Sequence, residues 1–262
     1  MNIEVSRVEV NNIMPLRELY RQEMNCQIVH DSLHRRGFND SYLIRVDSQS
    51  AGYGTVTSGN DEHKVFQRGI LNEFYLLPTY KALAVPVFRQ LLATSQAIRI
   101  LVQTNDVLLM LMLYDFADTI TSDTILFHDA RTTNLSLPDP DVVFRKATQS
   151  DPADDNDWLL EVAGNIVATG GFATHYNPPY GDIYMGVAEP YRRRGYGSYL
   201  VQELKKVCYE AGRRPAARCN AANMASRKTL EKAGFLPCAR ILSGSVSADK
   251  LKEHPSLMPE TR

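Results

Sequence analysis

The stretch Tyr191-Arg192-Arg193-Arg194-Gly195-Tyr196-Gly197-Ser198 decides how this chain is interpreted. An apolar run, residues 183–187, precedes it, and an amphipathic helical pattern follows it. Two glycines allow a tight turn and a close approach of the backbone to a ligand. The amides at the start of the next helix have no partner within that helix, so they point toward an incoming negative group. The stretch therefore predicts an anion site, to which Arg192 adds a charged fork suited to phosphate oxygens.

Composition limits the other functions open to the chain. Its 262 residues are 44% hydrophobic and 23% charged, as in globular proteins of one or two domains. The formal net charge is -1, so no overall positive field attracts nucleic acid, and any anion site must be local. Glu4 and Glu9 lie near the N-terminus, and no long apolar segment follows them. We therefore expect neither a signal peptide nor a membrane span, and we predict a cytoplasmic protein.

The four cysteines favour packed, reduced thiols. Cys26, Cys208, Cys219 and Cys238 show no CxxC spacing, which argues against zinc and fits a cytoplasmic setting. Cys219 ends a predicted buried strand, but no histidine is placed beside it by the sequence. We therefore interpret Cys219 as a packing residue and not as a nucleophile.

Both halves of the chain are predicted to alternate strands and helices. In the first half, β-formers favour strands at residues 42–46, 53–57 and 71–77, followed by helix, strand, helix and strand. In the second half, two strands meet at Ala163-Gly164-Asn165 as a hairpin, and the glycine stretch is followed by helix, strand, helix and a last apolar run. The repeated order predicts two α/β domains of one architecture.

A polar segment with Pro138 and Pro140 separates the halves. Such composition is typical of an exposed connection between domains. We expect domains at residues 1–129 and 142–262, joined by a linker at residues 130–141.

Two runs after the glycine stretch add to its meaning, Asn223-Met224-Ala225-Ser226 and Leu230-Glu231-Lys232-Ala233-Gly234-Phe235. Together with Arg192, Gly195 and Gly197, they resemble the GNAT superfamily of acyl-CoA-dependent N-acyltransferases. The resemblance implies two tandem GNAT-like domains, each a mixed, mostly antiparallel sheet flanked by helices. It implies that the second domain binds acetyl-CoA as co-substrate, without a metal, and transfers the acetyl group to an amine by direct attack.

The resemblance also assigns roles along the coenzyme A molecule. The pyrophosphate would rest on main-chain amides of residues 193–198, where the helix dipole favours an anion independently. The pantetheine arm would pair with residues 183–187, and an amide near their end would stabilise the oxyanion. Arg193 and Arg194 fit a solvent-exposed role equally well, and Asn223 also fits a plain helix cap. The predicted cofactor-binding residues are Met185, Val187, Arg192, Arg193, Arg194, Gly195, Tyr196, Gly197, Ser198, Asn223 and Ser226.

The catalytic acid and base are not evident. Many GNAT members carry a tyrosine acid just before the Glu-Lys pair of the last helix, where this chain has Leu230. Ser226 and Tyr184 are the candidates to replace it. The candidate bases are Asp182, Glu189 and His175. We select Tyr184, Ser226 and Asp182 as the catalytic candidates, with a packing or surface role as the alternative for each.

The first half lacks the glycine pair at the corresponding turn, Pro78-Thr79-Tyr80-Lys81-Ala82-Leu83-Ala84. We expect no pyrophosphate site there and one active site per chain. Between Lys146 and Trp158 only a short acidic loop is available, where the family normally has two helices. We therefore expect the first domain to be structural or to shape the acceptor site, with the acceptor cleft between the domains.

Two other functions are considered. A non-catalytic acyl-CoA sensor or interaction module would explain the absent tyrosine. A nucleotide cofactor is disfavoured, because a P-loop needs Gly-Lys-Ser/Thr and a dinucleotide fold needs an acidic residue after the next strand. The expected partner is a small-molecule or peptide amine, and neither nucleic acid nor a membrane is expected. The oligomeric state, a homodimer included, is left open.

Overall fold

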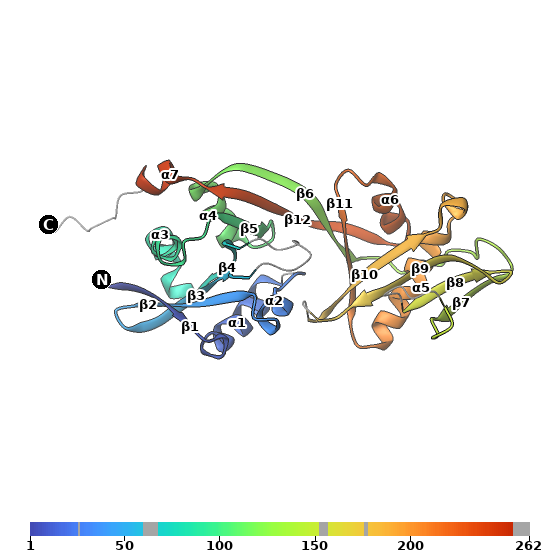
Figure 1. Ribbon diagram of the computed structural model, residues 1–262, viewed down its shortest axis with the longest axis horizontal. Helices are drawn as coiled ribbons and strands as arrows, with labels where there is room; N and C mark the ends of the chain where they lie inside the picture. The colour runs from blue at the N-terminus through green and yellow to red at the C-terminus, as the bar shows by residue number, and fades with distance from the viewer. Residues whose placement is uncertain (26, 60–67, 152–156, 176–177, 254–262) are drawn as a thin grey trace. The chain divides into compact units, whose positions relative to one another are not determined.

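The structure, a computed structural model, contains two compact units, each a sheet flanked by helices (Figure 1). Unit 1 combines Met1–Ser122 with the segment that begins at Arg240, and unit 2 is Asp123–Ala239. The structure describes residues 1–25, 27–59, 68–151, 157–175 and 178–253.

Unit 1 contains a mixed sheet in the order β1-β2-β3-β4-β5-β12. Its strands are β1 (Ile3–Val8), β2 (Asn39–Val46), β3 (Gln49–Thr57), β4 (Ile70–Leu76), β5 (Arg99–Gln103) and the end of β12 (Phe235–Val246). Strands β4 and β5 run parallel, and the other neighbours run antiparallel.

Helices pack on both faces of the unit 1 sheet. They are α1 (Met14–Met24), α2 (Asp31–Arg35), α3 (Ala84–Ser95), α4 (Val107–Phe116) and α7 (Ala248–Glu253), with 3-10 turns η1 (Val10–Asn12) and η2 (Pro78–Leu83). Successive side chains of a strand point to opposite faces. Phe74 and Leu76 of β4 accordingly pack in the cluster that contains α3 and α4, whereas Tyr75 packs in the cluster that contains α1.

Unit 2 contains a second sheet in the order β6-β11-β10-β9-β8-β7. Its strands are the end of β6 (Ala117–Asp129), β7 (Val142–Lys146), β8 (Trp158–Val162), β9 (Asn165–Ala173), β10 (Tyr180–Val187) and β11 (Arg214–Asn220). Strands β10 and β11 run parallel, and the other neighbours run antiparallel. Ala163 and Gly164, with φ of 48° and 78°, form the tight turn of the predicted hairpin. The predicted mixed, mostly antiparallel sheets flanked by helices are confirmed.

The helices of unit 2 pack on one apolar side of its sheet. They are α5 (Tyr196–Glu210) and α6 (Met224–Lys232), preceded by the 3-10 turn η3 (Glu189–Tyr191). Leu200 and Leu204 of α5 and Leu230 of α6 share a buried cluster with Ile183 and Ala217 of the central strands. The described residues between β7 and β8 form no helix.

Two strands contribute to both units. Residues 124–128 of β6 pair with β11 in unit 2, although the first part of β6 belongs to unit 1. Residues 241–245 of β12 pair with β5 in unit 1, whereas Phe235 at the start of β12 is buried in the core of unit 2. Local sequence patterns do not predict this exchange, because register between strands far apart in the chain leaves no local signal.

Residues 130–141, predicted as a linker, contain no helix or strand but lie within unit 2. The carbonyl of Arg131 accepts a hydrogen bond from the buried Lys205 Nζ at 2.8 Å. The amide of Leu135 donates to the Gln202 side chain at 2.7 Å. Because both partners belong to α5, this segment is attached along that helix.

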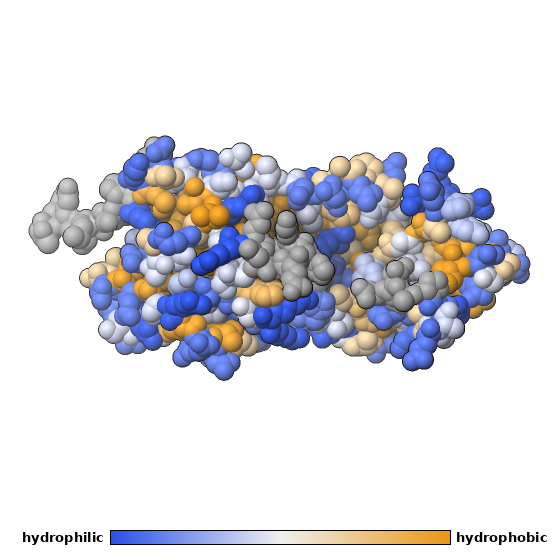
Figure 2. Space-filling view, in the orientation of Figure 1, coloured by the Kyte–Doolittle hydropathy of each residue, from blue (hydrophilic) through white to orange (hydrophobic). Residues whose placement is uncertain are grey.

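The face shown in Figure 2 is mostly hydrophilic, with small apolar patches between polar residues. Among the described helices, none is long and apolar enough to cross a membrane.

Candidate functional site

In unit 2, strands β10 and β11 separate part of the way along their length. Their parallel register runs from Tyr180 opposite Arg214 to Ile183 opposite Ala217 and ends there. On its other edge, β10 stays paired with β9 as far as Val187. Within the described chain, Met185, Gly186 and Val187 at the end of β10 thus have no strand partner on the β11 side. Alternate main-chain groups along this edge can therefore pair with an added extended ligand.

The two glycines of the turn after β10 have different structural roles. Gly195 is the N-cap of α5 and has a φ of 94°, a conformation that strains any side chain. Arg193 also lies in the left-handed region, with a φ of 64°. A Cβ at Gly197 would approach the side chains of Thr229 and Val187 to 3.2 Å. Gly195 therefore permits the turn, and Gly197 permits close packing of α5 against β10 and α6.

The first turn of α5 presents three main-chain amides, those of Tyr196, Gly197 and Ser198. The first α-helical hydrogen bond runs from the Tyr199 amide to the Gly195 carbonyl at 3.1 Å. No acceptor for the three preceding amides is found in the part of the chain that the structure describes. Such amides carry the positive end of the helix dipole. The arrangement is therefore suited to an anion.

The same three residues line an open groove of about 880 Å³. From β10, Met185 and Val187 line it, and from the start of α6, Asn223 and Ser226 line it. The groove thus joins the separated strands to the start of α5. The structure brings together all the predicted cofactor-binding residues except Arg194 along this groove, and their contact with a cofactor stays a prediction.

Cations without acidic partners surround the groove. Arg192 and Arg193 line it, and the Arg192 Nε donates a hydrogen bond to the Val187 carbonyl at 3.2 Å. Arg194 instead lies over the Tyr191 ring, 5.8 Å from its centroid. Within the described residues, no carboxylate lies within 4 Å of any of the three arginines. Because the net charge of the whole chain is -1, any positive charge for an anion must be local, and these arginines supply it beside the groove.

The start of α6 fixes Ser226 beside the groove. The Asn223 side chain caps the helix by accepting a hydrogen bond from the Ser226 amide at 3.0 Å. Burial raises the pKa of the Cys219 thiol, and a hydrogen bond with Ser226 opposes that rise. Cys219 is buried, and a thiol with a raised pKa is a poor nucleophile. The geometry favours the packing role predicted for it.

The other catalytic candidates lie away from the groove. Leu230, in the place of the family's tyrosine, is buried in the core of unit 2. Asp182 is buried and pairs with Arg218, with 2.9 Å between its Oδ2 and the arginine Nε. The Tyr184 side chain lies against Gly171, and neither Asp182 nor Tyr184 lines the groove. Ser226 is the one of the three selected candidates that does, and the catalytic roles stay predictions.

The remaining candidate bases, Glu189 and His175, are exposed and do not line the groove. Among the described residues, no group of three or more His, Cys, Asp or Glu side chains is placed to hold a metal ion. Cys26 lies outside the described residues.

Unit 1 repeats the strand separation, but its described residues do not repeat the candidate anion site. The parallel pairing of β4 with β5 ends at Leu71 opposite Ile100. The turn after β4 continues as η2 directly into α3, so the Ala84 amide donates to the Lys81 carbonyl. Leu83 precedes α3 where Gly195 precedes α5, and Pro86, the third residue of α3, has no amide hydrogen. The start of α3 therefore does not present three main-chain amides as the start of α5 does.

The gap between β4 and β5 is occupied by the chain itself. Residues 27–30, which precede α2, cross it, and Ile28 exchanges two hydrogen bonds with the Gln103 side chain, at 2.7 and 3.2 Å. On the other side, the His30 amide donates to Glu73 at 3.3 Å. Ile28 and Val29 are buried. This segment thus bonds to both separated strands.

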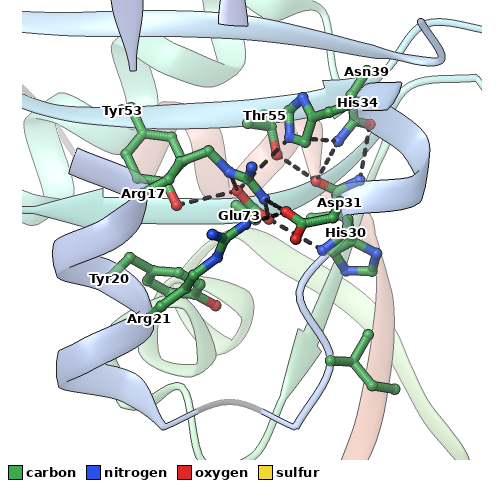
Figure 3. Close-up of polar contacts among 12 residues, drawn as sticks. Arg17, Tyr20, Arg21, His30, Asp31, His34, Asn39, Tyr53, Thr55 and Glu73 are labelled. Carbon is green, nitrogen blue, oxygen red and sulfur yellow. Dashed lines mark hydrogen bonds and ion pairs between the residues drawn. The ribbon is translucent and has the colours of Figure 1, made fainter. Parts of the chain in front are cut away.

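A buried ionic cluster holds this segment in place (Figure 3). The Arg17 guanidinium donates two hydrogen bonds of 2.9 Å to Glu73 and a third of 2.9 Å to Asp31. Arg21 also pairs with Asp31. Burial raises the pKa of the Glu73 carboxyl, but Arg17 and a hydrogen bond with His34 outweigh it and hold the pKa well below its usual range. The cluster joins α1 and α2 to β4.

A second buried carboxyl lies at the far end of this gap. Asp106 caps α4 by accepting a hydrogen bond from the Leu109 amide, as Asn223 caps α6. The Tyr20 hydroxyl donates to its other oxygen at 2.9 Å. Burial raises the pKa of Asp106 to about 6, although these two hydrogen bonds act to lower it. The cavity beside it holds only about 20 Å³, room for about one water molecule.

Comparison with protein families gives two matches that divide the chain. A family model described as "Acetyltransferase (GNAT) family" matches residues 125–235, and one described as "Acetyltransferase (GNAT) domain" matches residues 9–130. No curated protein matches the sequence.

Solved structures share the fold at low sequence identity. An acetyltransferase of the GNAT family from Colwellia psychrerythraea has a TM-score of 0.70 and 17% identity, over 93% of this chain and 100% of that one. A GCN5-related N-acetyltransferase from Sphaerobacter thermophilus has a TM-score of 0.58 and 14% identity, over 93% and 95%. A tandem GNAT protein from the clavulanic acid biosynthesis pathway has a TM-score of 0.57 and 10% identity, over 94% and 99%.

Proposed function

This chain belongs to the GNAT acetyltransferase family, whose members move an acyl group from acyl-CoA to an amine, and we propose that its second domain uses acetyl-CoA. The observation that carries the proposal is the set of three amides at the start of α5, without described acceptors, beside an open groove. The pyrophosphate binds these amides together with Arg192 and Arg193, because fixed donors and nearby positive charge stabilise a dianion.

The acetyl thioester lies between the separated strands. The pantetheine arm pairs with the free edge of β10, as an added strand. The amine nitrogen attacks the thioester carbonyl carbon, a C–N bond forms, the C–S bond breaks, and the proton lost by the amine balances the one gained by the thiolate. An amide near Met185 or Val187 stabilises the carbonyl oxygen as its negative charge develops.

Ser226 is the proposed donor of the proton to the thiolate. It lines the groove at the start of α6, whereas the Leu230 side chain is buried and has no proton to give. Tyr184 is the alternative acid. Asp182 is the proposed base, and it is buried in an ion pair with Arg218.

The first domain does not bind acetyl-CoA in this proposal, and it is structural or shapes the acceptor site. The acceptor is a small-molecule or peptide amine, and the enzyme works in the cytoplasm. A non-catalytic acyl-CoA sensor is the second candidate, favoured by the buried Leu230 in place of an acidic hydroxyl.

Turnover with a panel of amines tests the proposal. Acetyl-CoA is supplied, free thiol is followed, and a mass shift of one acetyl group identifies the acceptor. We expect Gly195→Glu to reduce kcat/KM by at least about 100-fold, about 2.7 kcal/mol, because it places a negative side chain in the anion site. Gly164→Glu is the matched control, since Gly164 also has a positive φ and open space but lies in the hairpin of β8 and β9.

Each outcome separates the candidates. Thiol release that depends on an amine supports the enzyme. Tight binding of acetyl-CoA without release, across the panel, supports the sensor. Equal loss in the two glycine variants contradicts the assigned anion site.

A further inference from the structure

We propose that a groove at the end of α3 in unit 1 binds a small monocarboxylate with an apolar body, held by Arg89. The groove has a volume of about 350 Å³, which is within the range of sites for small molecules. The proposed function assigns no ligand to unit 1. The inference therefore goes beyond that function and does not depend on it.

One wall of the groove is a single face of α3. Arg89, Leu92 and Gln96 lie along it at positions i, i+3 and i+7, which share one side of a helix. Apart from Arg89 and Gln96, the side chains that line the groove are apolar. They are Leu92, Ala93, Ala97, Ile98, Val246 at the end of β12, and Leu251 of α7. Ile98 is 60% exposed, so this apolar surface is open to the body of a ligand.

Arg89 provides a hydrogen-bond donor that the described chain does not use. Its Nε is buried, and no acceptor for it is found among the described residues. Within the same residues, no carboxylate pairs with the guanidinium. Arg99 at the start of β5 differs, because its Nη2 donates to the Ser243 hydroxyl at 2.9 Å. A buried donor without an acceptor destabilises the fold, so an acceptor carried by a ligand would stabilise it.

The charge of the groove selects the kind of anion. Arg89 is the one cationic side chain among the described residues that line it, and the Gln96 amide donates to the Ala93 carbonyl. A planar guanidinium donates two parallel hydrogen bonds to one carboxylate, and the pair has no net charge. A phosphate dianion would keep an uncompensated charge beside apolar walls, which is unfavourable. The aliphatic or aromatic body of the carboxylate would then pack against Leu92 and Ile98.

Calorimetric titration of the full chain with octanoate tests the inference. Octanol, which has the same chain length without the charge, is the comparison ligand. We expect one octanoate site per chain and binding of octanol that is weaker by at least about 10-fold, because octanol cannot form the charged pair of hydrogen bonds with Arg89.

Three variants locate the site. Arg89→Met keeps an apolar stem without the charge, so it should weaken octanoate at least about 10-fold and leave octanol unchanged. Ala93→Trp adds a large side chain at an exposed position in the groove and should abolish binding of both ligands. Arg99→Met is the matched control. It removes the same charge from unit 1 outside the groove and should bind octanoate as the wild type does.

The outcomes that overturn the inference are specific. They are a wild-type chain that does not bind octanoate or binds octanol equally well, octanoate affinity that survives Arg89→Met or Ala93→Trp, and an equal loss in Arg99→Met. Thermal unfolding without ligand gives a separate check. Arg89→Met should not lower the Tm, because the Arg89 Nε has no described partner to lose. A lower Tm would mean that the chain itself supplies that partner, and it would also overturn the inference.

Discussion

The two units end their parallel strand pairs in the same way but fill the resulting gap differently. In unit 2 the gap opens into a groove of about 880 Å³, lined by cations and by amides that find no acceptor in the described parts of the chain. In unit 1 residues 27–30 cross the gap, and the remaining cavity is about 20 Å³. One architecture thus gives an open groove or a packed core, depending on whether the chain supplies its own partner for the separated strands.

The starts of the helices that follow the separated strands also differ between the two units. After Gly195, three amides at the start of α5 have no acceptor among the described residues, whereas the 3-10 turn η2 and Pro86 remove two of the corresponding donors at α3. The helix caps also differ in charge. Asn223 at α6 is neutral, and Asp106 at α4 places a carboxyl where an anionic cofactor would approach. Each difference reduces the ability of unit 1 to hold a pyrophosphate.

The largest expected effect comes from the ionic cluster that holds the unit 1 segment. Glu73→Leu leaves the buried Arg17 with Asp31, which it shares with Arg21, as its one carboxylate partner among the described residues. The loss of the Glu73 partner should lower the free energy of unfolding by about 3–5 kcal/mol. Chemical denaturation measures the loss. Arg17→Met/Glu73→Leu removes both charges and should be more stable than the single variant, while Asp31 keeps its pair with Arg21. The loss of unfolding free energy in the double variant is compared with the losses in Arg17→Met and Glu73→Leu added together. If the double variant loses as much as this sum, the result contradicts this role.

Asp106 should give a smaller, pH-dependent effect. Its pKa is raised from 3.8 to about 6 in the folded chain, so the folded state holds its proton more tightly than the unfolded state. This contribution to stability is present below pH 4 and is lost as the pH rises through 6. At 1.36 kcal/mol per pKa unit, the loss is about 3 kcal/mol.

Asp106→Asn keeps an acceptor for the Leu109 amide without the charge. Its stability relative to the wild type should therefore increase between pH 4 and pH 8, by up to about 3 kcal/mol. Denaturation curves across this range measure the difference. A constant difference across the range would show that Asp106 keeps its ordinary pKa in the fold.

Ser226 gives the smallest predicted effect. Ser226 lies three residues after the cap Asn223 of α6, and Leu109 lies three residues after the cap Asp106 of α4. A hydroxyl in unit 2 thus corresponds to an apolar side chain in unit 1. Ser226→Ala should lower kcat about 10-fold and leave the KM for acetyl-CoA unchanged, since water replaces the proton donor only in part. Steady-state kinetics separate the two constants. An unchanged kcat would favour Tyr184 as the acid.

Local patterns predicted most of the strands and helices in their order, because turn residues and apolar periodicity act over a few residues. They also indicated the candidate anion site, which stays a prediction. The first strand, β1, and the short helix α2 were missed. In β1, Ile3 and Val5 alternate with polar residues, a signal that was available. The cluster of Arg17 and Glu73 was not predictable, because its members lie 56 residues apart and charged residues are usually exposed.

The exchange of β6 and β12 between the units also required the structure. Apolar segments predicted both strands, but their partners depend on pairing between distant parts of the chain. The predicted linker shows the same limit. Proline and polar residues predicted that residues 130–141 are a linker between domains, and they gave no sign of the attachment of this segment to α5.

The central claim is that each chain has one acyl-CoA site, at the start of α5. Calorimetric titration of the wild-type chain with acetyl-CoA tests it most directly. The account predicts one site per chain, lost in Gly195→Glu and kept in Gly164→Glu. Two sites per chain, or one site that survives Gly195→Glu, would contradict it.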